Sequence, residues 1–263
     1  MRKTSRNLIF GAFAALTATA SGLGIAQQVT GVPGSPSATM TIPGDQLPAP
    51  QIKFGGEIKP LAQNSKSFWQ PRIVPPKGAP NVLLIMTDDS GFGVPSTFGG
   101  VIPTPALDRI AGNGLRYTNF HSTALCSPTR AALITGRNHH SAGFGVIAEQ
   151  ATGFPGYNGM VPRENGFLSE MLRAEGYATL GIGKWHLTLA SEYASGASKA
   201  RWPLSRGFER FYGFIAGKTN QWVPTLVHDN HYVEPPRRPE EGYHLNADLA
   251  DRAMEYLTDL RGI

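Results

Sequence analysis

The sequence predicts an α/β fold in which a mostly parallel central sheet is layered with helices. Residues 82–86, Val-Leu-Leu-Ile-Met, form an uninterrupted apolar run, which is typical of a strand buried on both faces of a parallel sheet. Beyond this run, segments of strand type and helix type alternate along the chain, as they do in layered α/β proteins. Hydrophobic residues make up 41% of the 263 residues, and this fraction excludes a wholly disordered chain.

Helical signals occur in four segments. These are residues 104–111, 128–135, 164–175 and 246–261. In the first, Thr104 is a suitable helix cap and Pro105 suits the first helical position. In the last, leucine and alanine recur at helical spacing behind Asn246, which we expect to cap the helix. Further strands are expected at residues 115–120 and 177–182.

The chain divides into three parts. Residues 1–26 join a positively charged start to a short apolar stretch that ends in small residues, which is typical of a secretory signal peptide. The apolar stretch is shorter than the about 20 residues that span a bilayer, so we expect cleavage and no stable membrane span. Residues 27–79 are rich in proline and glycine and predict an extended leader without chemistry. Residues 80–263 then form the folded part of an exported protein, periplasmic or secreted.

Charge and cysteine content exclude several classes of function. The formal net charge is +5, but the signal segment holds three basic residues and no acidic one, so the remainder is close to +2. No basic stripe remains outside the signal, and this argues against a nucleic-acid partner. The single cysteine excludes an intrachain disulfide framework and a multi-cysteine zinc site.

Two adjacent carboxylates, Asp88 and Asp89, follow the apolar run directly. Ligand sites in open α/β sheets lie beyond the carboxyl ends of the strands. Neighbouring carboxylates repel each other unless a cation lies between them, and oxygen ligands suit calcium or magnesium. A turn in which one aspartate caps the backbone is the alternative.

The only cysteine, Cys126, lies just before a predicted helix, in the sequence Leu-Cys-Ser-Pro-Thr-Arg. The helix dipole there favours a thiolate or a bound anion, and Arg130 follows one turn later, so both can face the same spot. A cysteine-dependent phosphatase has a wider spacing between its cysteine and arginine. A buried structural cysteine is the other alternative. In an exported protein a bare reactive thiol is exposed to oxidation, which argues against ordinary thiolate catalysis.

Residues 181–186 read Gly-Ile-Gly-Lys-Trp-His after a run of strand type. Lys184 and His186 are two positions apart, so they project to the same side if the backbone stays extended. A cation and a titratable ring on one side suit anion binding and proton transfer. On its own this pattern also occurs by chance in loops.

Together the three segments resemble the sulfatase family, in particular the bacterial arylsulfatases of the alkaline-phosphatase-like fold. Residues 126–130 match the Cys-x-Pro-x-Arg core of the family signature, and residues 131–137 continue it. Residues 81–93 are similar to the opening strand with its Asp-Asp pair, and residues 181–186 resemble the second signature, Gly-x-Gly-Lys-Trp-His. The resemblance implies a layered sandwich that is incomplete at the C-terminus.

The resemblance also implies a specific chemistry for Cys126. A formylglycine-generating enzyme would oxidise it to Cα-formylglycine, an aldehyde that hydrates. One hydroxyl then attacks the sulfur of a small-molecule sulfate ester and expels the alcohol or phenol. The second hydroxyl loses its proton, the aldehyde re-forms and sulfate leaves.

Roles for the other residues follow from the same resemblance. The calcium ligands would be Asp88, Asp89 and the modified Cys126. Arg130 would hold the hydrate, Lys184 would bind sulfate oxygens and His186 would transfer protons, with fixed positive charge opposing the charge of the transition state. His139 and His140 are candidates for substrate contact, with a structural role as the alternative.

Sulfatases continue well past this length, and their later half supplies a further metal-binding pair, a histidine and a lysine. We therefore expect residues 80–263 to be the N-terminal part of a sulfatase catalytic domain, truncated and with little activity alone. One alternative is a phosphate or phosphonate monoester hydrolase of the same superfamily. The other is a non-catalytic remnant.

Overall fold

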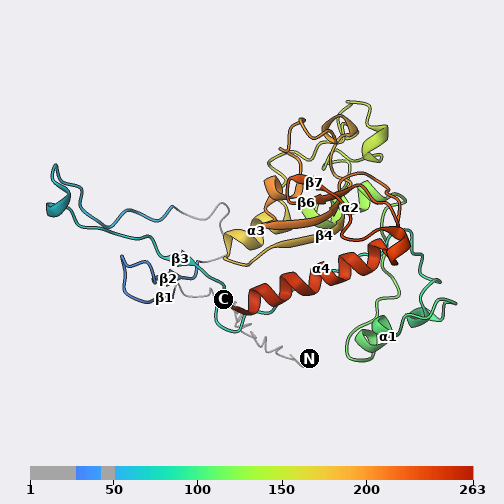
Figure 1. The fold of residues 1–263 in the computed structure, drawn as a ribbon, viewed down its shortest axis with the longest axis horizontal. Coiled ribbons are helices and arrows are strands. Elements are labelled where there is room, and N and C mark those ends of the chain that lie inside the picture. The colour runs from blue at the N-terminus through green and yellow to red at the C-terminus, as the bar shows by residue number, and fades with distance from the viewer. Residues whose placement is uncertain (1–27, 43–50, 263) are drawn as a thin grey trace, which may run out of the picture.

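The computed structural model describes residues 28–42 and 51–262 (Figure 1), so the predicted signal peptide lies outside the described residues. Its main body is built on a four-stranded sheet with the order β4-β5-β6-β7. The strands are β4 (Leu180–Lys184), β5 (Arg210–Phe214), β6 (Leu226–His228) and β7 (His231–Val233). β4 and β5 are parallel, whereas β6 is antiparallel to both of its neighbours. The predicted α/β class is confirmed, and the described sheet is mixed, with its parallel pairing between β4 and β5.

Helices pack on both faces of this sheet. They are α2 (Cys126–Thr135) and α3 (Leu168–Ala174) on one face and α4 (Leu245–Asp259) on the other, with α1 (Pro105–Gly112) at the periphery (Figure 1). Successive strand residues point to opposite faces. Accordingly, Phe211 of β5 packs in the apolar cluster of Trp202, on the side of α2. Its neighbour Tyr212 packs with Leu245 and Tyr256 of α4.

The helix ends follow the local sequence closely. Pro105 occupies the first turn of α1, and α2 ends at Gly136 with a left-handed φ of 64°. The cap of α4 differs from the prediction: His244 Nδ1 accepts a hydrogen bond from the backbone N–H of Asn246 at 3.2 Å, so Asn246 lies inside the helix. Within residues 28–42 and 51–262, no helix combines the length and apolar character that a membrane crossing requires.

Two of the predicted strands do not form. Residues 82–86 and 115–120 are irregular, with Leu83 78% and Leu115 83% exposed. A strand buried on both faces needs neighbours to receive its hydrogen bonds and to cover its side chains. Among the described residues no strand pairs with either segment. The strand predicted at 177–182 does form, but as β4 it starts three residues later and ends at Lys184.

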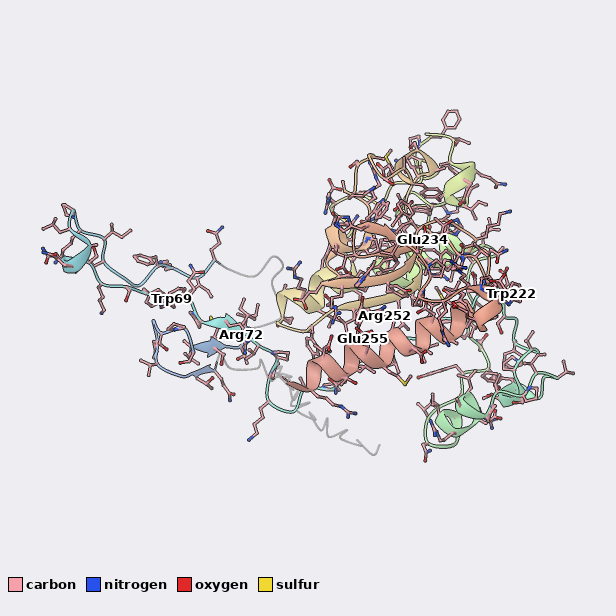
Figure 2. All side chains as sticks on the ribbon, in the orientation of Figure 1. Trp69, Arg72, Trp222, Glu234, Arg252 and Glu255 are labelled. Carbon is pink, nitrogen blue, oxygen red and sulfur yellow. The ribbon has the colours of Figure 1, made fainter. Side chains whose placement is uncertain are left out.

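The described leader forms a small sheet of its own beside the main body (Figure 1). It consists of β1 (Val29–Thr30), antiparallel to β2 (Thr39–Met40), and β3 (Arg72–Ile73), parallel to β2. Trp69, near β3, is more than half exposed (Figure 2). The leader touches the main body at Gly176, which follows α3 with a φ of 86°; a Cβ there would lie 2.5 Å from the carbonyl oxygen of Ile73. Glycine therefore permits this close approach.

Candidate active site

Cys126 is the first residue of α2 and carries a free, half-buried thiol. The preceding Leu125 is extended, with φ −134° and ψ 155°, so the helix starts abruptly at the cysteine. Ser127 is fully buried, and its Oγ accepts a hydrogen bond from the backbone N–H of Ala148 at 3.2 Å. Because the first turn of a helix has free N–H groups and the positive end of the dipole, this position favours an anion.

Arg130 lies one turn further along α2 and connects this helix to the sheet. Its Nη1 donates to the carbonyl oxygen of Lys184, the last residue of β4, at 2.5 Å. Burial lowers the pKa of Arg130, while the nearby Asp88 and Cys126 raise it. Its Nε is buried without a hydrogen-bond partner among the described residues. The guanidinium thus has one nitrogen bonded to the backbone of Lys184 and another, Nε, that no acceptor in the described part of the chain contacts.

Lys184 continues the chain of contacts toward the two aspartates. Its side chain is only 8% exposed, and Nζ lies 2.8 Å from Oδ2 of Asp88. Burying a charge without a partner is unfavourable, so this ion pair offsets the burial of the Lys184 side chain. Asp89, next in the chain, has a left-handed φ of 49°. Asp88, Lys184 and Arg130 therefore form one connected set, in which Arg130 also lies close enough to Cys126 for this residue to raise its pKa.

His186 lies two residues beyond the end of β4 and is fully buried. Its φ is 59°, so the extended backbone on which the sequence prediction depended does not continue to this residue. The backbone N–H of His186 donates to the carbonyl of Ile215 at 2.9 Å, and Nε2 lies 2.7 Å from Oε2 of Glu149. Nδ1 is buried, and nothing in the described part of the chain hydrogen-bonds to it.

The protonation of His186 is governed by burial and by its charged neighbours. Burial lowers the pKa of His186, and the cations of Lys184 and Arg130 lower it further, against the opposing effect of Glu149. The pKa of Glu149 is also lowered: burial raises it, but the hydrogen bonds from His186 and Tyr193 outweigh this. At neutral pH the pair is therefore a neutral imidazole beside a carboxylate.

The donor set only partly fits a calcium ion. Asp88 and Asp89 offer oxygen ligands of the type that hard cations prefer. Across residues 28–42 and 51–262, however, no group of three or more His, Cys, Asp or Glu side chains converges on one point. The residues that the structure describes thus do not form a complete coordination shell for a cation.

The remaining candidates, His139 and His140, make structural contacts. His139 Nδ1 lies 3.0 Å from the carbonyl of Phe144, and His140 Nε2 lies 3.1 Å from the hydroxyl of Tyr157, so both rings hold loops together. Trp222 is half exposed near the start of α4, where its ring packs edge-on against His244 (Figure 2).

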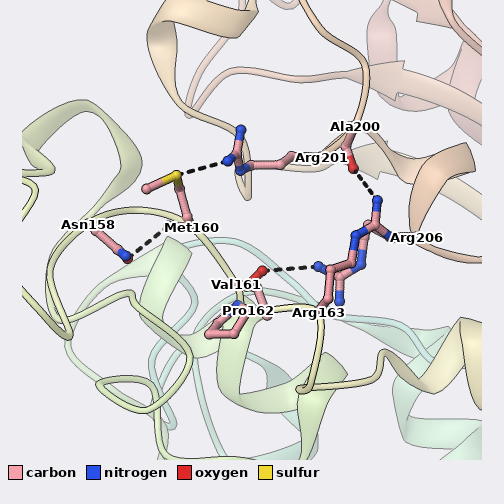
Figure 3. A pocket seen from close by; sticks show the side chains of 8 residues that line it. All are labelled: Asn158, Met160, Val161, Pro162, Arg163, Ala200, Arg201 and Arg206. Carbon is pink, nitrogen blue, oxygen red and sulfur yellow. Dashed lines mark hydrogen bonds between the residues drawn. The ribbon is translucent and has the colours of Figure 1, made fainter.

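A pocket of about 330 Å³ contains none of the predicted site residues (Figure 3). It is lined by Asn158, Met160, Val161, Pro162, Arg163, Ala200, Arg201 and Arg206. Arg206 is buried and pairs with Glu170 at 3.0 Å, and Arg201 pairs with Glu192. Arg163 donates to two backbone carbonyls. Since all three guanidinium groups have protein acceptors, they bind loops to one another.

Glu149 is the residue at the site that the sequence did not reveal. It lies 37 positions before His186 and belongs to η3 (Ala148–Gln150), a single 3-10 turn. Nothing in the surrounding residues marks it, because the contact exists only once η3 packs between α2 and the end of β4.

Comparison with known proteins identifies relatives. The family model described as Sulfatase matches residues 80–262. An uncharacterized sulfatase of Schizosaccharomyces pombe is 39% identical to this chain over 151 residues. The aligned region covers 55% of this chain and 26% of that protein. The arylsulfatase of Klebsiella aerogenes is 34% identical over 145 residues (54% and 30%), and the human steryl-sulfatase is 37% identical over 139 residues (51% and 23%). The chain thus spans between 23% and 30% of the length of these relatives.

Solved structures share the fold. Ps i-CgsB superposes with a TM-score of 0.51 at 23% identity, covering 66% of this chain and 40% of that one. The PsFucS1 sulfatase from Pseudoalteromonas sp. superposes with a TM-score of 0.50 at 23% identity, covering 66% of this chain and 39% of that one. These likenesses confirm the predicted alkaline-phosphatase-like α/β architecture. The family model matches well over half of the residues of this chain, and the chain therefore belongs to the sulfatase family.

Proposed function

We propose that this chain carries the nucleophile-bearing part of an active site that hydrolyses sulfate monoesters. One observation supports this most strongly: Arg130 joins the helix of Cys126 to Lys184, which in turn pairs with Asp88. The position of the nucleophile is thereby linked through its helix to two cations and a carboxylate, and fixed positive charge of this kind stabilises the transfer of an anionic sulfuryl group.

Arg130 and Lys184 bind the sulfuryl oxygens in this proposal. The side chain of Lys184 is buried and Arg130 is half-buried, so their charge acts more strongly on an anion than it would in water. The free Nε of Arg130 is available as a donor to the substrate or to the nucleophile. His186, neutral at pH 7, accepts a proton at Nδ1.

The two groups implied by the family complete this chemistry. Cys126, once converted to formylglycine and hydrated, would supply an oxygen nucleophile, and Asp88 and Asp89 would hold a calcium ion that supplies positive charge. Since no group of three or more His, Cys, Asp or Glu side chains converges within residues 28–42 and 51–262, we expect this chain alone to turn over aryl sulfates slowly.

Mass spectrometry of the peptide that contains Cys126 tests the proposal directly. The chain is produced with a formylglycine-generating enzyme in a host that modifies a control sulfatase. We expect the cysteine to lose its sulfur and gain an aldehyde. A thiol that stays unmodified while the control is converted contradicts the proposal.

Hydrolysis assays separate the alternatives. Nitrophenyl sulfate and nitrophenyl phosphate are compared on the modified chain, with Cys126→Ala as the background. A preference for the sulfate supports the proposal, and a preference for the phosphate favours a phosphate monoester hydrolase. Rates equal to the Cys126→Ala background for both esters favour a non-catalytic remnant.

Export through the general secretory route is part of the proposal. Residues 1–26 carry the charged start, the apolar stretch and the small residues of a cleavable signal. The intact mass of the protein recovered from the periplasm or medium tests this. We expect a chain that begins after Ala20 or Ala26, whereas a full-length chain retained in the cytoplasm contradicts it.

A further inference from the structure

Glu149 has an unusual set of contacts for a residue that is 36% exposed. Its Oε2 lies 2.7 Å from Nε2 of His186. Its Oε1 accepts hydrogen bonds from the hydroxyl of Tyr193 at 3.0 Å and from the backbone N–H of Gly217 at 3.1 Å. Both carboxylate oxygens are thus held by residues from three separate segments, which restricts the side chain to one orientation.

Gly217 makes this arrangement sterically possible. A Cβ at position 217 would lie 2.6 Å from Nε2 of His186 and 3.0 Å from Oε1 of Glu149. Such distances are too short for a real Cβ, so any larger residue would push the imidazole or the carboxylate away. The main chain therefore closes directly over the pair.

The same segment is fixed to the nucleophile helix. The backbone N–H of Ala148 donates to Oγ of the buried Ser127, the residue after Cys126. Glu149 follows Ala148 immediately, so this hydrogen bond ties the backbone that carries the carboxylate to the start of α2. The backbone of His186 is held independently, by its bond to Ile215 and by a left-handed φ that a non-glycine residue adopts only under constraint.

We propose that Glu149 is a positioning residue that fixes His186 as the Nε2–H tautomer and leaves the Nδ1 lone pair free for proton transfer at the nucleophile. A carboxylate can only accept hydrogen bonds, so the nitrogen that faces it must carry the hydrogen. Nδ1 is then the basic atom, and it is the buried atom without a partner among the described residues. The role of Nδ1 rests on the proposed sulfatase function, whereas the tautomer does not.

The tautomer can be read by NMR on the full chain with ¹⁵N-labelled histidine. There are seven histidines, and His186→Gln identifies the signals of this ring. At pH 7.5 we expect a protonated Nε2 and an unprotonated Nδ1. A wild-type spectrum with the proton on Nδ1 overturns the proposal without any variant.

Two variants separate positioning from general packing. Glu149→Gln is nearly isosteric but can both donate and accept, so we expect a mixture of tautomers and a lower pKa for His186, because the attraction of the carboxylate is lost. Tyr193→Phe removes a contact to the other oxygen, and we expect the Nε2–H tautomer to persist. An unchanged His186 spectrum in a folded Glu149→Gln protein contradicts the proposal. Besides Glu149, the charged groups that act on this ring are Lys184 and Arg130, which both variants retain.

Activity gives an independent measurement. On nitrophenyl sulfate, Glu149→Gln should lower kcat by about 10- to 100-fold and leave KM nearly unchanged. A Cys126 that stays unmodified while the control sulfatase is converted would refute the sulfatase function and leave the tautomer result standing. Loss of the tautomer with normal turnover would refute the positioning role alone.

Discussion

The Nη1 atom of Arg130 donates to the carbonyl oxygen of Lys184 at 2.5 Å and so joins the first turns of α2 to the end of β4. The bond connects a side chain to the main chain, so the backbone of Lys184 is fixed while its ammonium remains free to pair with Asp88. Two cations of the site are therefore positioned by one interaction, and a change at Arg130 affects both.

Replacement of Arg130 by alanine should destabilise the protein measurably. Hydrogen bonds to charged groups contribute about 1.5–3 kcal/mol, so we expect the free energy of unfolding to fall by about that amount in urea titrations, with the m-value unchanged. Arg137, exposed just beyond the same helix, is the matched control, and its alanine variant should change stability by less than about 0.5 kcal/mol. Equal effects at the two positions would contradict the structural role of the Lys184 contact.

Calcium should raise the melting temperature of the wild type through Asp88 and Asp89. A ligand that binds only the folded state at a hundred times its Kd stabilises by about 2.7 kcal/mol. The double variant Asp88→Asn/Asp89→Asn should lose this calcium-dependent shift, whereas Asp251→Asn, on the exposed side of α4, should retain it. The same titration with magnesium distinguishes the two ions. A shift that persists in the double variant would place the ion elsewhere.

Acid should destabilise the protein through His186. The pKa of this buried imidazole lies below its ordinary value of 6.5, so the unfolded chain binds a proton that the folded chain does not. The contribution of His186 to the free energy of unfolding is therefore fully present above pH 6.5. It is lost as the pH decreases below this value, by at most about 1.4 kcal/mol per pH unit for one proton. Urea titrations at pH 7.5 and 5.5 should show a smaller loss for His186→Gln than for the wild type. An identical loss would mean that other groups dominate in this range.

Local sequence was a good guide where local structure positions the residue. The spacing of one turn between Cys126 and Arg130 and the helix end at Gly136 were predicted from the sequence, although the helix starts at Cys126 and not, as predicted, at residue 128. The contact between Glu149 and His186 was not, because it joins two turns that are far apart in the chain. No sequence pattern predicts the left-handed backbone of His186 either, because such conformations in non-glycine residues arise from tertiary constraints.

The apolar run at residues 82–86 shows a second limit of prediction from the sequence. Its composition predicts burial, but composition does not provide the neighbouring strands on which burial depends. The described chain leaves Leu83 78% exposed, whereas Val227 of β6, in an equally apolar setting, has a strand on each side and no exposed surface. The two residues therefore allow a direct test.

Leu83→Lys should change the free energy of unfolding by less than about 0.5 kcal/mol, because an exposed side chain loses little when it becomes polar. Val227→Lys should unfold the protein or destabilise it by more than about 4 kcal/mol, because it buries an unpaired charge. Urea titrations of both variants, alongside the wild type, measure the contrast. A large loss in Leu83→Lys would show that residues 82–86 are buried in solution, as the sequence alone predicts, and that the open conformation is wrong.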